Sequence, residues 1–292
     1  MRINTNVASL VAQESNTNTN NRIGSSLEKL SSGLRINKAS DDASGLAIAD
    51  KLRTHASALN QAVSNGNSAV TLTQIADKAM DEESKILDVV KQKLLQASTA
   101  TTSAEGIDAI GKDIKKLLDQ IDNIAEQTTY NGTKLLQGAS AGEGSSQLDF
   151  QMGATATDLI SLDSAVQANT KGLDGMSALK VSAGGAFGAT SASTAGSAQK
   201  AARAHIASID SALNTLNAWR ADVGSTQNQL ESGIRNLMTQ VTNTKAAESV
   251  IRDVDYAAES SNFNKQNIIS QAGTYALSQA NSMSQNVMRL LQ

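Results

Sequence analysis

Apolar residues recur along much of the chain at alternating spacings of three and four residues. This spacing lines one face of an α-helix and is typical of helices that pack lengthwise against other helices. The first such stripe predicts a helix of about 50 residues, roughly 75 Å long at the standard helical rise. Its positions are Ile48, Leu52, Leu59, Val63, Val70, Met80, Leu87 and Leu94.

Two further stripes follow the first. The second predicts a shorter helix, and the polar connector STATTSAEG before it allows the two helices to fold back antiparallel. Its positions are Ile107, Ile110, Ile114, Leu117, Ile121 and Ile124. The third predicts another long helix, at positions Ile206, Ile209, Leu213, Leu216, Val223, Leu230, Ile234, Leu237 and Val241. The expected fold is therefore mainly α, a coiled-coil-like bundle of long antiparallel rods.

The helical period breaks between the second and third stripes. YNGTKLLQG at 130–138 and QLDFQMGATATDLISLD at 147–163 combine Asn-Gly or Gly turns with short alternating apolar segments, which predicts a small β-hairpin element. Residues 182–198, SAGGAFGATSASTAGSA, are Gly, Ala, Ser and Thr with little to bury. We expect this segment to be an exposed, mobile connector.

The two ends of the chain carry weaker stripes. The polar segment ESNTNTNN at 14–21 interrupts the first, and small residues dilute the second, so that burial there yields about half of what a leucine stripe gives. A helix-patterned segment that buries too little to offset its ordering entropy orders on a partner, here most simply on copies of itself. The expected subunit-contact residues are Ile3, Val7, Leu10, Leu27, Leu30, Leu34, Ile269, Met283, Val287, Leu290 and Leu291.

Composition and charge narrow the function classes. The 292 residues include no Cys, no Pro and 2% aromatic residues, which excludes disulfide-stapled and zinc-thiolate proteins. A net charge of −3, with no local basic patch, argues against a nucleic-acid partner. No apolar run approaches the roughly 20 residues of a membrane span, and the start MRINTNVASL lacks the order of a secretory signal. We expect neither a nucleic acid nor a membrane among its partners.

Four segments of this sequence resemble the signatures of bacterial flagellins. They are INTNVASLVAQ at 3–13, LEKLSSGLRINKASDDASGLAIADKL at 27–52, QTTYNGTKLL at 127–136 and VIRDVDYAAESSNFNKQNIISQAGTYALSQANSMSQNVMRLLQ at 250–292. The resemblance covers nearly the whole chain in the order of the family, which a generic coiled coil would not reproduce.

The resemblance implies a division into domains. Paired terminal helices, residues 1–39 and 255–292, would form an inner core domain on the lumen side of a filament. Residues 40–181 and 199–254 would form an outer core domain of helical rods and β-hairpins. The connector 182–198 stands where many flagellins insert variable outer domains, so the chain is similar to core-only flagellins of the Campylobacter-like lineage.

The same resemblance implies a function and a set of partners. The chain would be a structural subunit, not an enzyme, that self-assembles helically into the flagellar filament used for motility. Members of the family leave the cell unfolded through the flagellar type III apparatus without a cleaved signal peptide. Expected partners are other flagellin subunits, an export chaperone at the carboxy-terminal end, the filament cap protein and the hook-filament junction protein. The alternatives are a junction protein or a non-polymerising helical export or adaptor protein.

Carboxylates and histidines are the candidate chemical sites of the sequence. Asp41 and Asp42 precede an apolar-periodic run, so capping of backbone N–H groups is their expected use. Asp253 and Asp255 lie beside Arg252 at the entry to the last helix, where either capping or a salt bridge is expected rather than a metal. His55 and His205 lie far apart in sequence without a metal-binding motif. We expect no catalytic residue, no cofactor and no metal.

Two further features acquire meaning only through the resemblance. Arg35, in SSGLRIN, lies at the boundary between the expected domains, where it either ties neighbouring subunits through carboxylates or is a solvated helix-end charge. Lys91, Gln92 and Lys93 occupy the place where flagellins sensed by an innate-immune Toll-like receptor carry Arg-Glu-Leu. This altered segment predicts reduced recognition by the receptor. The Ser/Thr-rich connector is a candidate for O-glycosylation, or else a bare loop.

Overall fold

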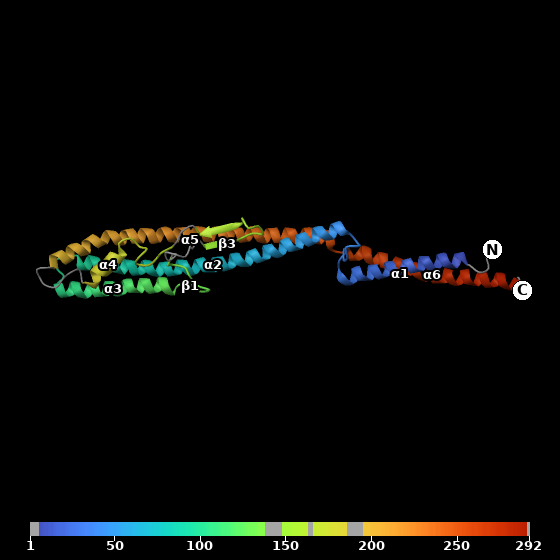
Figure 1. The fold of residues 1–292 in the computed structure, drawn as a ribbon, viewed down its shortest axis with the longest axis horizontal. Helices are drawn as coiled ribbons and strands as arrows, with labels where there is room; N and C mark the ends of the chain where they lie inside the picture. Colours follow the sequence, from blue (N-terminus) through green and yellow to red (C-terminus); the bar gives the residue numbers. More distant parts are fainter. Residues whose placement is uncertain (1–5, 138–147, 163–165, 186–194, 291–292) are drawn as a thin grey trace. The chain divides into compact units, whose positions relative to one another are not determined.

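The computed structural model describes residues 6–137, 148–162, 166–185 and 195–290. The expectation of a mainly α fold with a small β-hairpin element is confirmed (Figure 1). Its helices are α1 Val7–Ser32, α2 Ala43–Ala97, α3 Ala104–Gln127, α4 Met176–Gly184, α5 Ala195–Arg252 and α6 Tyr256–Leu290. Its strands are β1 Thr129–Tyr130, β2 Thr133–Lys134, β3 Leu148–Gln151 and β4 Leu159–Leu162.

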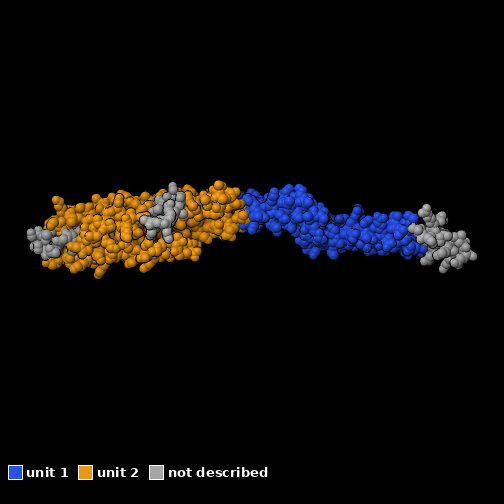
Figure 2. Space-filling view, in the orientation of Figure 1, with its two compact units in different colours: residues 1–57, 240–292 blue, residues 58–239 orange. Residues whose placement is uncertain are grey.

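Contacts within the chain divide it into two compact units (Figure 2). The first unit comprises residues 1–57 and 240–292, and the second comprises residues 58–239. The two units are compact parts of a single chain, whereas the inner and outer core domains expected from the resemblance are parts of a filament. The boundaries of those domains therefore stay a prediction.

The second unit is built around a core to which α2, α3, α4 and α5 all contribute. The three long helices run alongside one another, with α4 beside α3 (Figure 1). The stripes predicted for α3 and α5 face this core or are half-buried throughout. In α2, Leu59, Met80, Leu87 and Leu94 are buried as expected. Because Leu, Ile and Val at helical spacing bury a continuous seam, local sequence is enough to specify this bundle.

One position of the α2 stripe was predicted wrongly. Ile48 is 49% exposed, whereas the adjacent Ala49 is fully buried. Further alanines, among them Ala56 and Ala69, are also buried along α2. Small side chains allow close helix approach, so burial in this part of α2 follows residue size as well as hydrophobicity.

Two antiparallel hairpins confirm the expected β element. In the first, Tyr130 pairs with Thr133 around Asn131 and Gly132, both with positive φ, as a tight two-residue turn requires. In the second, β3 pairs with β4 from Leu148↔Leu162 to Gln151↔Leu159. A Cβ atom added to Gly66 of α2 would lie 2.9 Å from Met152 Cε, so this glycine makes room for the methionine that follows β3.

The expectation of an exposed connector at 182–198 was wrong at both of its ends. Residues 182–184 belong to α4, and residues 195–198 begin α5. Ala183 and Ala198 are fully buried in the core, because their methyl groups fill space beside larger apolar side chains. The middle of the connector, 186–194, lies outside the described residues.

In the first unit, α1 and α6 run along each other in opposite directions (Figure 1). The Asn6 side chain caps the start of α1 by accepting a hydrogen bond from the backbone N–H of Ser9, at 3.2 Å. The helix continues through the polar segment 14–21, where Thr17 and Thr19 donate hydrogen bonds to carbonyls four residues earlier. Gly33, in the left-handed region at φ 74°, ends it.

Candidate assembly surface

The contact between α1 and α6 includes several polar side chains. The buried residues of α1 are Thr19 and Ser26, both with hydroxyl side chains. Ser26 Oγ donates a hydrogen bond to the carboxylate of Glu259, and Asn6 Nδ2 donates to the carbonyl of Ala280 at 3.1 Å. Between these two levels, Ser270 Oγ donates to Asn20 Oδ1 at 3.1 Å. Hydrogen bonds therefore join the two helices, together with half-buried apolar side chains such as Ile23 and Phe263.

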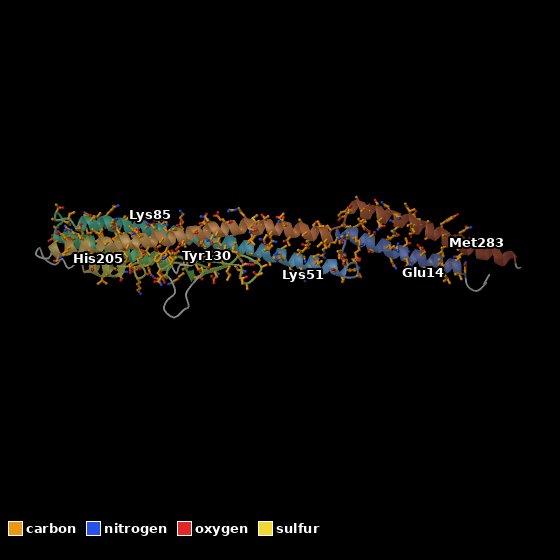
Figure 3. All side chains as sticks on the ribbon, turned by 90° about the horizontal axis from the view of Figure 1, so that it is seen from above. Glu14, Lys51, Lys85, Tyr130, His205 and Met283 are labelled. Carbon is orange, nitrogen blue, oxygen red and sulfur yellow. The ribbon has the colours of Figure 1, made fainter. Side chains whose placement is uncertain are left out.

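Many large apolar residues of these helices are nevertheless exposed. In α1, Val7 and Leu10 are 60% and 54% exposed, and in α6 Tyr275 is 75% exposed. Met283 of α6, labelled in Figure 3, is 63% exposed. Large apolar side chains arranged along both helices of a pair, with polar groups between them, form a surface suited to contact with another molecule. This outward apolar face is the candidate assembly surface.

The residues predicted for subunit contacts fall into three groups. Five of them are exposed: Val7, Leu10, Leu27, Ile269 and Met283. Leu30 and Leu34 are half-buried. The remaining four lie outside the described part of the structure. Ile3 and Leu291 are not described, and the side chains of Val287 and Leu290 are not described.

Sequence reasoning missed several members of the same surface. Val11, Ile268 and Tyr275 are all more than half exposed. Each lies next to a predicted position or about two helical turns from one. These residues were missed because the prediction used one narrow apolar stripe on each helix. Val11 also borders a shallow hollow of ≈ 310 Å³ on α1. The signal that would have found these residues is the whole apolar content of each helix, not one stripe.

A short paired segment joins the ends of four helices in the first unit. Leu34 forms an antiparallel bridge with Asp253, and the Val254 amide donates to the Gly33 carbonyl at 3.0 Å. Arg35 Nη2 donates to the carbonyl of Ile251 at 2.6 Å, near the end of α5. A cation beside the last carbonyl groups of a helix interacts favourably with the helix dipole. This contact agrees with the expectation that Arg35 is a charge at a helix end. A contact with a neighbouring subunit stays a prediction.

The expected helix caps are confirmed for Asp42 and Asp255, whereas Asp253 accepts instead from the Ser249 hydroxyl at 2.5 Å. Asp42 Oδ1 accepts from the Gly45 amide at 2.9 Å, at the start of α2. Asp255 Oδ1 accepts from the amides of Ala257 and Ala258, at the start of α6. Asp41 accepts backbone hydrogen bonds that hold its pKa below the ordinary value. These carboxylates satisfy N–H groups that have no intrahelical partner.

The remaining candidate sites are dispersed. His55 is exposed, and His205 Nε2 lies 3.2 Å from Ser182 Oγ, where burial lowers its pKa. In the part of the chain that the structure describes, no three His, Asp or Glu side chains converge as metal ligands. Within the same residues, no helix has both the length and the apolar content that a membrane span requires.

The altered immune-receptor segment lies on α2 in the second unit. Lys91 Nζ is 2.6 Å from Asp210 Oδ1 of α5, and Lys93 Nζ is 3.0 Å from Asp113 Oδ2 of α3. Gln92, between the two lysines, is exposed. Both cations are therefore engaged with carboxylates of neighbouring helices of the same chain.

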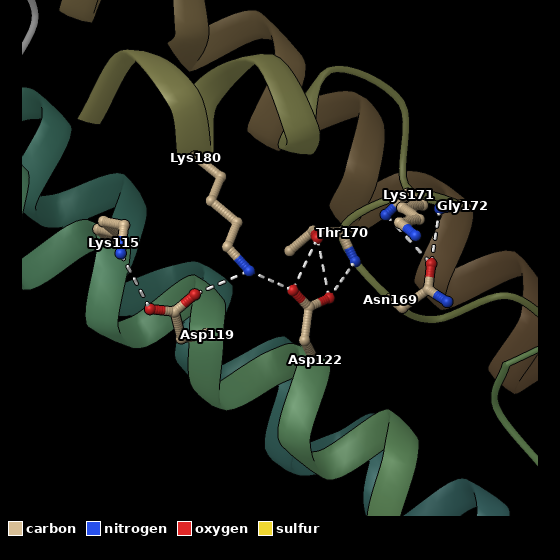
Figure 4. A network of polar contacts seen from close by, with 8 residues as sticks. All are labelled: Lys115, Asp119, Asp122, Asn169, Thr170, Lys171, Gly172 and Lys180. Carbon is tan, nitrogen blue, oxygen red and sulfur yellow. Dashed lines mark hydrogen bonds and ion pairs between the residues drawn. The ribbon is translucent and has the colours of Figure 1, made fainter. Parts of the chain in front are cut away.

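A polar network ties α3 to α4 and to the loop before it (Figure 4). Asp122 accepts hydrogen bonds from the backbone N–H and the hydroxyl of Thr170, at 2.9 and 2.8 Å. Lys180 of α4 bridges Asp122 and Asp119. Its hydrogen bond lowers the pKa of Asp119, and Lys115 pairs with the same carboxylate. Charged groups thus fasten the edge of the bundle, where they are partly solvated.

Glu83 lies in the interior of the second unit near this network. Its side chain on α2 is fully buried, and neither carboxyl oxygen has a hydrogen-bond partner. Burial, with a smaller contribution from the charge of Asp122, raises the pKa of Glu83 to about 9. The side chain is therefore a neutral carboxylic acid at neutral pH. Sequence reasoning missed Glu83, although its spacing of three residues from Met80 and four from Leu87 places it on the same face of α2.

Comparison with known proteins places this arrangement in a family. Residues 3–141 match the family model described as the bacterial flagellin N-terminal helical region. Residues 206–291 match the bacterial flagellin C-terminal helical region.

Individual relatives agree over the full length. The chain is 39% identical to the flagellin of Bacillus subtilis and 34% identical to the flagellar filament 33 kDa core protein of Treponema phagedenis. Both alignments cover 100% of this chain and 100% of the relative. A crystal structure of Bacillus cereus flagellin is similar with a TM-score of 0.46 and 26% identity, over 63% of this chain and 94% of that chain. With two family models covering most of its residues and relatives matching from end to end, the chain belongs to the bacterial flagellins.

Proposed function

We propose that this flagellin subunit polymerises through the outward apolar faces of α1 and α6. Flagellins are structural subunits of the flagellar filament and not enzymes, and this chain is such a subunit. The observation that carries the proposal is the exposure of large apolar side chains along both terminal helices. Hydroxyl and amide groups lie between the helices, while Val7, Leu10 and Met283 lie outside.

The energetics support contact between copies. Full burial of one Val, Leu or Met side chain stabilises by about 1.5–3 kcal/mol, so a handful of such residues per subunit yields a strong lateral contact. Contacts between different surface patches that do not close into a ring generate open filaments. Each added subunit then covers apolar surface of its neighbours, which couples ordering of the ends to growth.

Finer aspects of the function belong to the same proposal. In the filament, residues 1–39 and 255–292 form the inner core domain, and residues 40–181 and 199–254 form the outer core domain. The subunit leaves the cell through the flagellar type III apparatus without a cleaved signal peptide. A chaperone holds its carboxy-terminal end, the cap protein guides its insertion, and the junction protein links the filament to the hook. The resemblance supports these assignments.

The altered segment 91–93 gives a proposal about host recognition. A receptor that recognises Arg-Glu-Leu at this place would meet Lys91 and Lys93 engaged with Asp210 and Asp113. Docking there would remove these charged side chains from water without complementary groups on the receptor, which disfavours binding. We expect purified monomer to activate a Toll-like-receptor reporter cell line weakly. Full-strength activation by the monomer would contradict this proposal.

Truncation tests the assembly surface most directly. Deleting residues 287–292 removes Val287, Leu290 and Leu291, and the truncated chain should keep a folded bundle but form no filaments after seeding. Electron microscopy measures growth, and far-UV circular dichroism measures the remaining helix. Filaments of normal length from the truncated chain would refute the role of the terminal helices.

Point variants refine the same test. Val7→Ser and Leu10→Ser each replace an exposed apolar residue of α1 and should lower the extent of polymerisation. The matched control is Val181→Ser in α4, because Val181 is 78% exposed but lies away from the terminal helices in sequence and in unit. The control should polymerise as the natural chain does. Equal loss in all three variants would show that exposed apolar area in general, and not this surface, drives assembly.

A further inference from the structure

The hydrogen bonds between α1 and α6 occur at three levels along the pair. Near the start of α1, Asn6 donates to the carbonyl of Ala280. In the middle, Ser270 Oγ lies 3.1 Å from Asn20 Oδ1 and 3.5 Å from Asn16 Oδ1. Near the end of α1, Ser26 donates to Glu259. The three levels follow one antiparallel alignment of the helices.

Hydrogen bonds between two helices restrict their lengthwise alignment more strictly than apolar contacts do. A hydrogen bond requires its donor and acceptor within about 3.5 Å and a favourable angle. Sliding one helix by a single turn moves each group by about 5.4 Å, which breaks all three levels at once. Apolar contact is non-directional and tolerates such a slide. Polar residues in the seam of a coiled coil are known to specify register at a cost in stability.

A glycine completes the middle level. A Cβ atom added to Gly273 would lie 3.7 Å from Asn16 Oδ1 and 3.9 Å from Asn16 Cβ. These are ordinary contact distances, so Gly273 and Asn16 face each other directly across the seam. The asparagine amide lies against the backbone of α6 at this point.

We propose that Asn16, Asn20 and Ser270 are the register-determining residues of the terminal helix pair. By fixing one alignment of α1 against α6, they fix which apolar side chains lie together on the outer surface. This second part rests on the proposed assembly through that surface. The polar seam thus selects the partner face, and the apolar exterior supplies the energy of contact between copies.

Disulfide formation measures the register directly, because the natural chain has no cysteine. The double variant Asn16→Cys with Gly273→Cys reports the observed alignment. Its Cβ atoms would be 3.9 Å apart, within the range of a disulfide. The variant Ser9→Cys with Gly273→Cys reports a slide of two turns, since Ser9 lies seven residues, or about 10 Å, along α1 from Asn16.

Both variants are oxidised with diamide, as soluble chain and as seeded filaments. A denaturing gel separates intramolecular disulfides from linked dimers. The in-register pair should give at least about tenfold more intramolecular disulfide than the shifted pair, as expected for a seam with one alignment. Adding Asn20→Leu and Ser270→Leu to both variants should reduce this preference to about threefold or less, because an apolar seam permits sliding.

A control with the same chemical changes is Asn21→Leu with Ser260→Leu, two described residues whose side chains make no hydrogen bond to the other helix. It should retain the tenfold preference. The proposal is overturned if the two cysteine pairs react equally in the natural seam, if the leucine seam keeps the full preference, or if neither pair forms a disulfide in soluble chain or filament.

Electron microscopy of the same samples separates this result from that of the proposed function. Filaments whose subunits show no register preference would overturn the register proposal and leave assembly through α1 and α6 standing. A register-specific disulfide in chains that never polymerise under seeded conditions would support the register proposal and overturn assembly through α1 and α6.

Discussion

The two units of this flagellin use the same helical element in opposite ways. In the second unit, Leu87, Ile114 and Leu216 are fully buried where helices meet. In the terminal pair of the first unit, Thr19 and Ser26 lie between the helices, and Val7 and Leu27 face outward. A helix stabilised by its own chain buries its apolar face inside, whereas one that awaits a partner presents that face to solvent.

This difference predicts two different sources of stability. Apolar burial against its own helices stabilises the second unit in a single chain. The terminal pair gains little from its polar seam, because each hydrogen bond exchanges with one to water and contributes about 0.5–1.5 kcal/mol. On the proposed assembly, neighbouring subunits supply most of its stabilisation.

The largest expected effect comes from truncating a core residue. Leu87→Ala removes a fully buried side chain of α2 and should lower the unfolding free energy of the soluble chain by about 2–5 kcal/mol. Leu27→Ala in α1, where the side chain is 55% exposed, should change it by less than about 0.5 kcal/mol. Urea unfolding followed by circular dichroism measures both values.

The two leucines exchange roles when assembly is measured. Leu27→Ala should raise the subunit concentration needed for seeded growth, because it removes part of the outward face. Leu87→Ala should leave that concentration nearly unchanged at a temperature where the bundle stays folded. Equal destabilisation of the soluble chain by both variants would break the comparison between the units.

A smaller effect is expected at the buried acid of the second unit. The pKa of Glu83 is raised to about 9 in the folded chain, above the ordinary value of 4.5. The folded state therefore binds the proton more tightly than the unfolded state does. Stability is greatest below pH 4.5 as far as this group is concerned, and it falls as pH rises from there to about 9.

Glu83→Gln should remove that dependence. The amide has nearly the same shape and needs no proton to stay neutral, so the folded state no longer has to take up a proton at high pH. The unfolding free energy near pH 8 should therefore rise, by roughly 1–3 kcal/mol after the cost of leaving the amide buried without partners. Urea unfolding at several pH values between 5 and 9 measures the slope. Glu82→Gln, at the adjacent exposed carboxylate that pairs with Lys85, should keep the natural slope. An unchanged slope in Glu83→Gln would show that the acid is not the cause.

The end of α1 gives an intermediate test within the first unit. Gly33 has φ 74°, and a Cβ atom there would lie 3.0 Å from the hydroxyl oxygen of Tyr256. Gly33→Ala should therefore cost about 1–2 kcal/mol in strain at this helix end. Gly24→Ala places a Cβ in open space within α1 and should stabilise the helix by up to about 1 kcal/mol.

Amide hydrogen exchange of the α1 segment in seeded filaments measures both changes. Faster exchange in Gly33→Ala and slower exchange in Gly24→Ala are expected. If Gly33→Ala exchanged as slowly as the natural chain, the left-handed end of α1 would not matter to the terminal pair.

Local sequence was sufficient for the bundle and the hairpins. The period of large apolar residues around Ile114 and Leu230, and the Asn131-Gly132 turn, are properties of short windows. A short window of sequence could not predict that Ala49 is buried and Ile48 exposed, because this choice depends on how closely α2 approaches its neighbouring helix. The same holds for the buried ends of the connector at Ala183 and Ala198.

The candidate assembly surface could be predicted only in part. Weak terminal stripes indicated that α1 and α6 require a partner, and most of the predicted residues with described side chains are exposed. The stripe in α1 nevertheless assigned importance to Leu27 and overlooked the adjacent Ser26, which is buried. A hydroxyl residue enters a seam only when a specific partner such as Glu259 receives its hydrogen bond, and that pairing spans most of the chain.

The smallest expected effect concerns the charges on the outside of the second unit. Lys91 and Asp210 join α2 to α5 at 2.6 Å, but both side chains are more than a third exposed, so solvent screens their attraction. A double-mutant cycle of Lys91→Gln and Asp210→Asn should give a coupling energy of about 0.2–1 kcal/mol at low salt, and less at 1 M salt. A coupling of several kcal/mol that persists in salt would mean that charge pairs, and not the apolar core, hold these helices together. The contrast between the units would then no longer rest on the placement of their apolar residues.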